Sequence, residues 1–527
     1  MFRYWIIIGL IIVSYSALAF NMYDLQIDKT GYYLAKAAAR GNLGSILNPE
    51  RRGIYFTDRN GNEIPVALNK EYPVIYGVPI EIDDAAEAAT ALSPVLGIEV
   101  GKLQTILSKP NSQYALLEAK ATDTQVEKIK ELGIRGIHIE SEMFRFYPFE
   151  NLAAQLLGFV GSSDKNDGIG GRYGLESYYN QKLQDDDIHL TIDRNIQSQA
   201  EKVLEDTIKK FNAPSGSVIV QDPRTGKILA MGSYPNFDPN NYSKSNIKTF
   251  LNPNIQSLYE PGSVFKVITM SAGIDSGKIT PDTTFYDSGS LIVNGKTIRN
   301  WDLKAHGKLT MTGVIEESVN TGAAFAERTT GHDIFYNYLL KFGLDEPTGI
   351  KLPGEISGNL RNLKTSSRDI NFATASFGQG VAVTPIQLIS AISAIANDGI
   401  RMRPYLNQDE MPLAMENVIS AETAHQVTNM MISAVDKAEI AHIPNYRIAG
   451  KTGTAQVADL IKGGYGDNFI HTYVGFAPAT DPKFTVLIKV DKPQARLAGA
   501  TVVPAFRELA QFILNYYNIP PDVPIAQ

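Results

Sequence analysis

The chain has 527 residues, a formal net charge of -7, 44% hydrophobic and 20% charged residues. This length exceeds one ordinary domain, so two or three folded domains are expected, and the composition is that of a globular protein. The acidic balance offers no basic surface to nucleic acid. The absence of cysteine excludes thiol nucleophiles, disulfides and cysteine-ligated metal sites.

An apolar run from Tyr4 to Phe20 follows Arg3 at the N-terminus. Its length lies at the lower end of the roughly 17–25 residues that span a bilayer. The basic residue before it predicts a cytoplasmic start, with the rest of the chain outside. We therefore predict a single membrane anchor over residues 1–21. A cleaved signal peptide is the alternative, because Ala17-Leu18-Ala19 has the small-residue pattern of a cleavage site.

Residues 22–190 predict a separate domain of short strands and helices. Asn60-Gly61 between apolar runs indicates a hairpin, and the stretches 82–108 and 122–133 have helical patterns. The glycine-rich stretch 168–174 reads as a flexible loop. It lacks the third glycine of G-x-G-x-x-G, and no P-loop motif occurs, so no phosphate cradle is predicted.

Residues 191–527 predict an α+β domain, an antiparallel sheet flanked by helices. A helix over 192–211 precedes two strands joined by the turn Asp222–Lys227, and helical patterns fill the middle. Strands from both ends of a region, separated by helices, form one sheet with a helical insert. The late elements are three strands and a helix: Arg447–Val457, Thr472–Ala477, Phe484–Val490 and Pro504–Tyr517.

The motif S-x-x-K occurs at Ser162, Ser245 and Ser263, and one match alone carries little information. The first two lie in polar loops. Pro261-Gly262 breaks the chain before Ser263, and an apolar helical run follows, so Ser263 would start a helix whose dipole favours negative charge. Lys266 lies on the same helix face, and burial near a second cation would lower its pKa until the neutral amine takes the Ser263 proton. A capping serine with a solvent-reaching lysine is the alternative.

The motif S-x-N occurs at Ser318-Val319-Asn320 and at Ser357-Gly358-Asn359, where it reads as a turn. The first follows a predicted helix over 311–317. A connection between helices could turn Ser318 and Asn320 towards one site, where Ser318 would relay a proton and Asn320 would bind substrate amides. Taken alone, the triplet favours a helix-capping turn.

The motif K-T-G occurs once, as Lys451-Thr452-Gly453, followed by Thr454. Gly453 permits close backbone approach, so an extended substrate could pair with this strand. Lys451, Thr452 and Thr454 would then bind its carboxylate. The alternative is a sheet-edge lysine that guards against aggregation.

The three motifs follow one another in the order of the serine acyl-transfer signature, S-x-x-K, S-x-N and K-T-G. No H-E-x-x-H or G-x-S-x-G sequence competes with them, which disfavours a zinc hydrolase and a Ser-His-Asp hydrolase. The sequence therefore predicts an acyl-transfer enzyme without a metal or cofactor.

At these motifs the chain resembles the class B penicillin-binding proteins, the membrane-anchored peptidoglycan D,D-transpeptidases. Tyr259–Ser263 is similar to the family's lead-in to the nucleophile, and Gly378-Gln379-Gly380 to a segment before its last strands. Arg52-Gly53, Arg145–Pro148 and Gly171–Glu176 are similar to motifs of its N-terminal pedestal domain. The resemblance covers nearly the whole chain.

The resemblance implies a catalytic set of Ser263, Lys266, Ser318, Asn320 and Lys451, with Thr452, Gly453 and Thr454 binding substrate. Ser263 would attack the penultimate D-Ala of a stem peptide, release D-Ala and pass the acyl group to an amine; β-lactams would acylate it. The family also implies partners: a membrane glycosyltransferase and other division or elongation proteins. The lead-in and the pedestal size favour the division-type branch.

Two other functions stay open at this point. A serine β-lactamase or D,D-carboxypeptidase would use water as the acceptor, and the sequence does not reveal which acceptor attacks. A non-catalytic regulator of a membrane glycosyltransferase would use only the pedestal. The membrane anchor and the large N-terminal region favour the transpeptidase, and the intact motifs disfavour the regulator.

Overall fold

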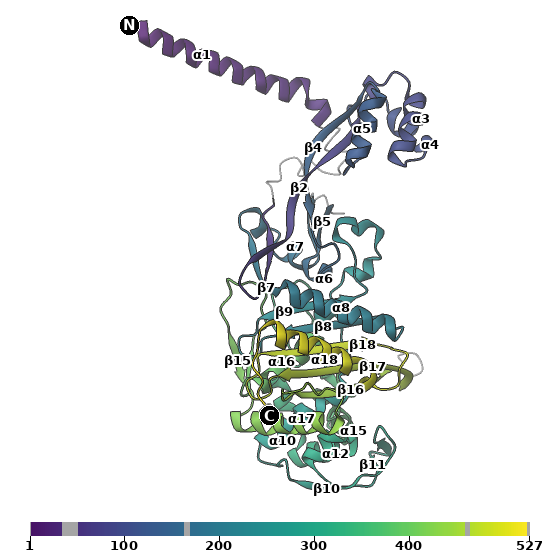
Figure 1. Cartoon of the computed structure of the whole chain (residues 1–527), viewed down its shortest axis with the longest axis vertical. Helices are drawn as coiled ribbons and strands as arrows, with labels where there is room; N and C mark the ends of the chain where they lie inside the picture. Colours follow the sequence, from purple (N-terminus) through teal and green to yellow (C-terminus); the bar gives the residue numbers. More distant parts are fainter. Residues whose placement is uncertain (1, 34–50, 163–168, 459–463, 524–527) are drawn as a thin grey trace.

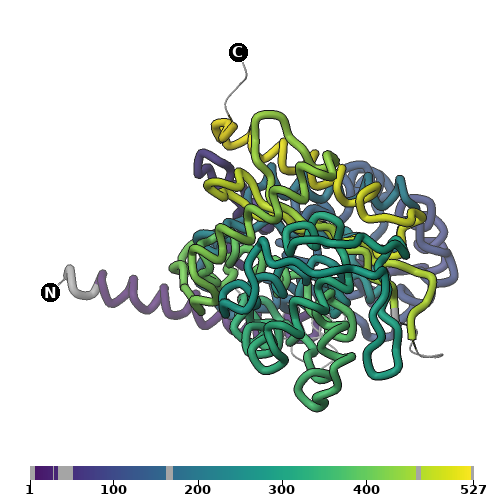
Figure 2. The backbone as a smooth tube through the Cα atoms, turned by 90° about the horizontal axis from the view of Figure 1, so that it is seen from below, coloured from purple at the N-terminus to yellow at the C-terminus, as the bar shows by residue number. Residues whose placement is uncertain are grey.

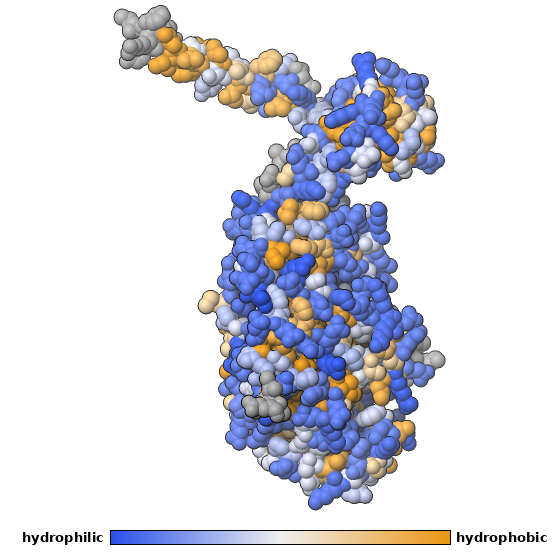
Figure 3. All heavy atoms as spheres, viewed as in Figure 1, coloured by the Kyte–Doolittle hydropathy of each residue, from blue (hydrophilic) through white to orange (hydrophobic). Residues whose placement is uncertain are grey.

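A computed structural model describes residues 2–33, 51–162, 169–458 and 464–523. The body is elongated in Figure 1, and helix α1 (Phe2–Tyr23) projects from it in both views (Figures 1 and 2). Helix α1 runs into the π-helical turn η1 (Asp24–Asp28). Figure 3 shows apolar side chains along α1, whereas polar side chains cover most of the visible body. By length and composition the helical stretch Ile6–Ile27 could cross a membrane, which suggests one anchor among the described residues.

A long strand, β2, connects the two ends of the N-terminal region (Figure 1). Its first residues pair with β1 across a tight turn at Gly61, which confirms the predicted hairpin, and its later residues pair with β4. β3 adds to the far end of β2, and β7 runs parallel to β1. The strands are β1 (Ile54–Thr57), β2 (Glu63–Gly77), β3 (Ala115–Glu118), β4 (Ile137–Phe146) and β7 (Ile188–Asp193).

Helices α3 (Ala85–Leu96), α4 (Val100–Leu107) and α5 (Asp123–Leu132) form a small head with the upper part of this sheet. The predicted helix over 82–108 is two helices, because Gly97 ends α3 with a φ of 67°. The glycine-rich loop prediction was wrong in part: strand β6 (Ile169–Arg172) pairs with β5 (Phe159–Ser162). The neighbouring strand β5 supplies the ladder that the glycines alone do not favour.

A buried carboxylate joins three segments of the pedestal. Glu176 is fully buried, and its two oxygens accept from Arg51 Nε at 2.5 Å and Arg145 Nε at 2.7 Å. Tyr147 donates its hydroxyl to the same carboxylate at 3.2 Å. A Cβ at Gly171 would lie 1.8 Å from the Glu176 carbonyl oxygen, so only glycine fits there. The pedestal motifs found in the sequence therefore meet at one ion cluster.

The second region contains a five-stranded antiparallel sheet in the order β16-β17-β18-β8-β9, with strands from both ends of the region. This confirms the α+β prediction. Asp222–Lys227 forms the predicted turn between β8 and β9. The strands are β8 (Ser215–Gln221), β9 (Ile228–Tyr234), β16 (Ala449–Ala458), β17 (Tyr465–Ala477) and β18 (Phe484–Asp491).

Alternating residues divide this sheet between two cores. Val218 and Val220 of β8 pack with α8 (Arg194–Lys210) and α18 (Ala498–Tyr516), whereas Ile219 faces the opposite core. That opposite core holds α10 (Phe265–Asp275), α16 (Pro385–Ala396) and most of the apolar face of α17 (Ala421–Ala438). Figure 1 shows α8 on one side of the sheet and α10 and α17 on the other.

Two predicted helix boundaries shifted. The helix predicted from residue 192 begins at Arg194, because Ile192 belongs to β7 and Asp193 caps α8 through the amides of Asn195 and Ile196. The last helix begins before Pro504, at Ala498, and its first turns are buried in the core. Tertiary packing therefore extends this helix past a residue that usually starts one.

Glu176→Gln is expected to destabilise the pedestal by roughly 3–5 kcal/mol, because two buried guanidinium groups lose their counter-charge. The lower melting temperature of the full chain in detergent would reveal it. Asp409→Asn is the control, because Asp409 forms an exposed ion pair with Lys182 at 3.3 Å. Such surface pairs contribute only about 0–1 kcal/mol. Equal effects of the two variants would contradict this role of Glu176.

Candidate active site

Ser263 lies in a 3-10 turn, η7 (Gly262–Val264), that runs directly into α10. Gly262 makes the tight approach possible: its φ is 58°, and its amide donates to the Gly378 carbonyl oxygen at 3.1 Å. Every residue of α10 from Phe265 to Ile274 is buried, whereas Ser263 keeps partial exposure. The turn therefore presents one hydroxyl at the end of a helix that the core holds on all sides.

Lys266 is completely buried, with an exposed fraction of 0%. Its Nζ donates to the Ser318 carbonyl oxygen and, at 3.2 Å, to Ser318 Oγ. Burial, and then the charge of Lys451, hold the Lys266 pKa well below its ordinary value. The amine is therefore predisposed to be neutral, as the sequence predicted, and it is anchored to Ser318.

Ser318 lies between two helices, α11 (Met311–Glu316) and α12 (Asn320–Thr330), with a φ of 55° that side-chain-bearing residues rarely adopt. Its Oγ also accepts from Lys451 Nζ, at 3.0 Å. One hydroxyl therefore receives hydrogen bonds from both buried lysines. The structure brings the first, second and third motifs together at this atom.

Lys451 belongs to β16, the strand at one edge of the five-stranded sheet. Its Nζ also donates to the Thr452 carbonyl oxygen at 3.2 Å, and burial lowers its pKa to about 7. A Cβ at Gly453 would lie 2.6 Å from the Pro261 carbonyl oxygen, so β16 passes close to the Ser263 turn. The Thr454 hydroxyl accepts from the Ala498 amide at 3.3 Å, which ties β16 to α18.

Asn320 begins α12, and its side-chain amide donates to the Arg299 carbonyl oxygen at 2.9 Å. Residues that the sequence analysis missed, Asp287, Asn300 and Thr321, form a buried hydrogen-bonded group beside it. Thr321 directly follows the S-x-N motif, but no local pattern links it to Asp287, which lies more than 30 positions before that motif.

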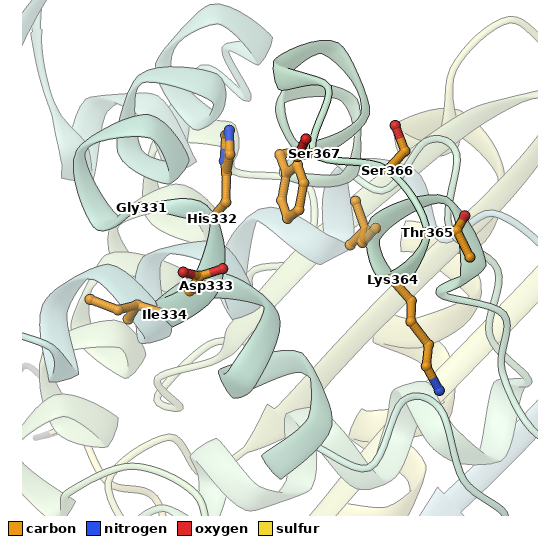
Figure 4. Close-up of a pocket in the computed structure, with 10 residues that line it drawn as sticks. Gly331, His332, Asp333, Ile334, Lys364, Thr365, Ser366 and Ser367 are labelled. Carbon is orange, nitrogen blue, oxygen red and sulfur yellow. The ribbon is translucent and has the colours of Figure 1, made fainter.

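The other motif matches lie elsewhere. Ser245 directly follows the 3-10 helix Pro239–Lys244, and the exposed Lys248 lies within the next one, Ile247–Phe250. The Ser162 match ends outside the described residues. Asn359 forms a β-bridge with Ala382. A cavity of about 730 Å³ between the start of α13 (His332–Lys341) and residues 363–367 contains none of the predicted site residues (Figure 4).

Two family profiles match the chain. The penicillin binding protein transpeptidase domain matches residues 216–511, and the penicillin-binding protein dimerisation domain matches residues 47–212. The chain is 32% identical to stage V sporulation protein D of Bacillus subtilis, over 89% of this chain and 78% of that protein. It is 30% identical to the probable peptidoglycan D,D-transpeptidase PbpC of Pseudomonas aeruginosa, over 99% and 96% of the two chains.

A solved structure of a peptidoglycan synthetase from Bifidobacterium adolescentis has the same fold, with a TM-score of 0.67 and 27% sequence identity. The likeness covers 91% of this chain and 98% of that one. The matches therefore extend over both the pedestal and the region that carries the three motifs. This chain belongs to the penicillin-binding protein transpeptidase family.

Proposed function

We propose that the chain is a peptidoglycan D,D-transpeptidase that cross-links stem peptides through an acyl-enzyme at Ser263 and is acylated there by β-lactams. The observation that carries this proposal is the Ser318 hydroxyl, which accepts hydrogen bonds from buried Lys266 and buried Lys451 beside the Ser263 turn. Lysines with lowered pKa values next to a serine are typical of an activated acyl-transfer site.

Acylation begins when neutral Lys266 takes the proton from the Ser263 hydroxyl. The Ser263 oxygen bonds to the penultimate D-Ala carbonyl carbon, and the backbone amides of Ser263 and Thr454 stabilise the oxyanion, each donor contributing about 3 kcal/mol. The bond to the terminal D-Ala then breaks, and Ser318 relays a proton from the lysines to the leaving amine. An amine of a second stem peptide attacks the ester, forms the new amide and returns the proton to Ser263.

The free edge of β16 suits an extended peptide, which would add as a strand beside Lys451–Thr454. In this arrangement Lys451, Thr452 and Thr454 bind the terminal carboxylate, Gly453 leaves room for the backbone, and Asn320 binds an amide of the stem peptide. The same contacts would hold the carboxylate of a β-lactam. No step requires a metal or cofactor.

We assign one role to each of the three regions of the sequence. Residues 1–21 anchor the chain in the membrane, residues 22–190 form the pedestal, and residues 191–527 carry out catalysis outside the cytoplasm. The positive residue before the apolar helix supports this orientation. We infer that the pedestal binds a membrane glycosyltransferase and other division or elongation proteins; the preference for division rests on the sequence resemblance.

Labelling with a fluorescent penicillin tests the nucleophile. Wild-type chain should form a long-lived covalent adduct, and Ser263→Ala should form none, because no other oxygen can bond to the β-lactam carbonyl at this position. Ser245→Ala is the matched control, since it removes the serine of another S-x-x-K match and should label normally. Equal labelling of the Ser263→Ala variant and wild type would show that the site assignment is wrong.

The fate of the adduct separates the transpeptidase from a hydrolase. We expect the covalent adduct to persist while free β-lactam remains in the solution without being hydrolysed. We also expect a D-Ala-D-Ala stem peptide to give cross-linked product when an amine acceptor is present. Rapid release of hydrolysed β-lactam, measured by loss of its absorbance, would falsify the transpeptidase in favour of a β-lactamase. Normal growth of cells that carry only Ser263→Ala would support a non-catalytic regulator.

Lys266→Arg should reduce acylation by about 100-fold or more, because a guanidinium does not act as a neutral base. The rate of penicillin labelling measures this loss. Lys248→Arg is the control, since Lys248 is the exposed lysine of another S-x-x-K match and should label at the wild-type rate. Retained acylation in Lys266→Arg would remove the proton-acceptor role from Lys266.

The pH dependence of acylation tests the coupling of the two lysines. Protonated Lys266 cannot accept a proton, so the labelling rate should rise with pH as Lys266 loses its proton. The charge of Lys451 lowers the Lys266 pKa, so Lys451→Gln should raise that pKa and move the rise in rate to higher pH. An unchanged or lower pH for this rise would contradict the coupling.

A further inference from the structure

Helix α12 starts without a side-chain cap of its own, although its first residue belongs to the S-x-N motif. Val319 occupies the cap position, and its side chain has no polar atom to accept from the free amides. The preceding residue, Ser318, has a φ of 55°. Local residues alone would therefore not fix the position of the loop that carries the Ser318 hydroxyl.

Asn300 supplies the missing cap from a distant segment. Its Oδ1 accepts from the Asn320 amide at 3.1 Å and from the Thr321 amide at 3.3 Å. Its Nδ2 donates to Asp287 Oδ2 at 2.7 Å and to the Lys304 carbonyl oxygen at 2.9 Å. Asn300 is 1% exposed, so water does not replace these bonds.

Asp287 fixes the orientation of Asn300. One carboxylate oxygen accepts from the Thr321 hydroxyl at 2.7 Å, and the other accepts from Asn300 Nδ2. Burial by itself would raise the Asp287 pKa, but hydrogen bonds from Thr321, the Gly289 and His306 amides and Asn300 hold it below its ordinary value. Asp287 is therefore a carboxylate that only accepts, which leaves Asn300 one way to place its amide: nitrogen to Asp287, oxygen to α12.

Arg299 and Trp301, the two neighbours of Asn300, hold the same loop from both sides. The Asn320 side chain donates to the Arg299 carbonyl oxygen at 2.9 Å, and Trp301 Nε1 donates to the Glu317 carbonyl oxygen at 3.1 Å. These bonds lie on either side of Ser318 in the sequence. The segment 299–301 therefore holds the loop one residue before and two residues after Ser318, the residue that contacts both lysines.

We propose that Asp287 and Asn300 are positioning residues for the acyl-transfer reaction: they cap α12 from outside and thereby fix the Ser318 hydroxyl between Lys266 and Lys451. This inference rests on the proposed function of the site. Neither side chain contacts the substrate or the reacting atoms. Each acts through Ser318, so its loss matters to acylation only while the Ser318 hydroxyl is present.

Asn300→Ala tests the proposal in the full chain, with the rate of fluorescent-penicillin acylation as the readout. The rate should fall by about 100-fold, the size expected when a reacting group is misplaced by about 1 Å. Asp193→Ala is the matched control, because Asp193 caps α8 through two amides in the same way but lies across the sheet from Ser318. It should lower the melting temperature and leave acylation near the wild-type rate.

A double-mutant cycle with Ser318→Ala distinguishes positioning from general stability. If Asn300 acts through Ser318, Asn300→Ala should cause little further loss of acylation in the Ser318→Ala background. Additive losses in the cycle would overturn the proposal. Wild-type labelling at Ser263 is measured in parallel, so failure of the proposed function itself would appear as unlabelled wild type and not as additivity.

The reciprocal swap provides a second test that does not depend on truncation. With Asp287→Asn alone, the new amide nitrogen faces groups that are themselves hydrogen-bond donors. With Asn300→Asp alone, two carboxylates face each other and neither can donate. Combining Asp287→Asn with Asn300→Asp restores one donor and acceptor pair and keeps an oxygen at the α12 amides. The combined variant should acylate faster than either single variant. A combined rate at or below both single rates would overturn the assigned roles.

Discussion

The site depends on one constraint: two lysine amines donate hydrogen bonds to the same serine hydroxyl. Lys266 and Lys451 are buried, and their hydrogen bonds converge on Ser318. Burial away from water disfavours the charged amine and lowers the pKa of both lysines, and the charge of Lys451 lowers the Lys266 pKa further. The geometry therefore favours the neutral amine at Lys266, the form that the proposed proton transfer from Ser263 requires.

Three elements of different kinds supply the groups that meet there. A helix buried on all sides carries Lys266, the edge strand β16 carries Lys451, and a strained connection between helices carries Ser318. A core helix and a sheet are rigid, but a loop is not, so the loop needs support from outside. Asn300 and Asp287 supply it through the α12 amides, the positioning role that we propose.

In the pedestal, a buried carboxylate holds separate segments together, as the buried lysines do in the active site. Glu176 pairs with buried Arg145 and with partly buried Arg51, which lies 125 positions away in the sequence. The long strand β2 then carries the sheet from the junction with the catalytic domain up to the small head. Because the cluster joins these segments, the pedestal depends on charge pairing as well as on apolar packing.

The sequence by itself determined the elements whose signals are local. Motif order singled out Ser263, Ser318 and Lys451, apolar length indicated a membrane anchor, and apolar runs on both sides of the turn Asp222–Lys227 indicated two strands of the sheet. Turn chemistry at Asn60-Gly61 also predicted its hairpin, because such signals act over a few residues.

Only the tertiary structure decided what depends on partners far apart in the chain. The convergence of both lysines on one hydroxyl, and the capping of α12 by Asn300, join residues 20 to 185 positions apart. No local propensity encodes such contacts, because they arise only when separate helices and strands pack against one another.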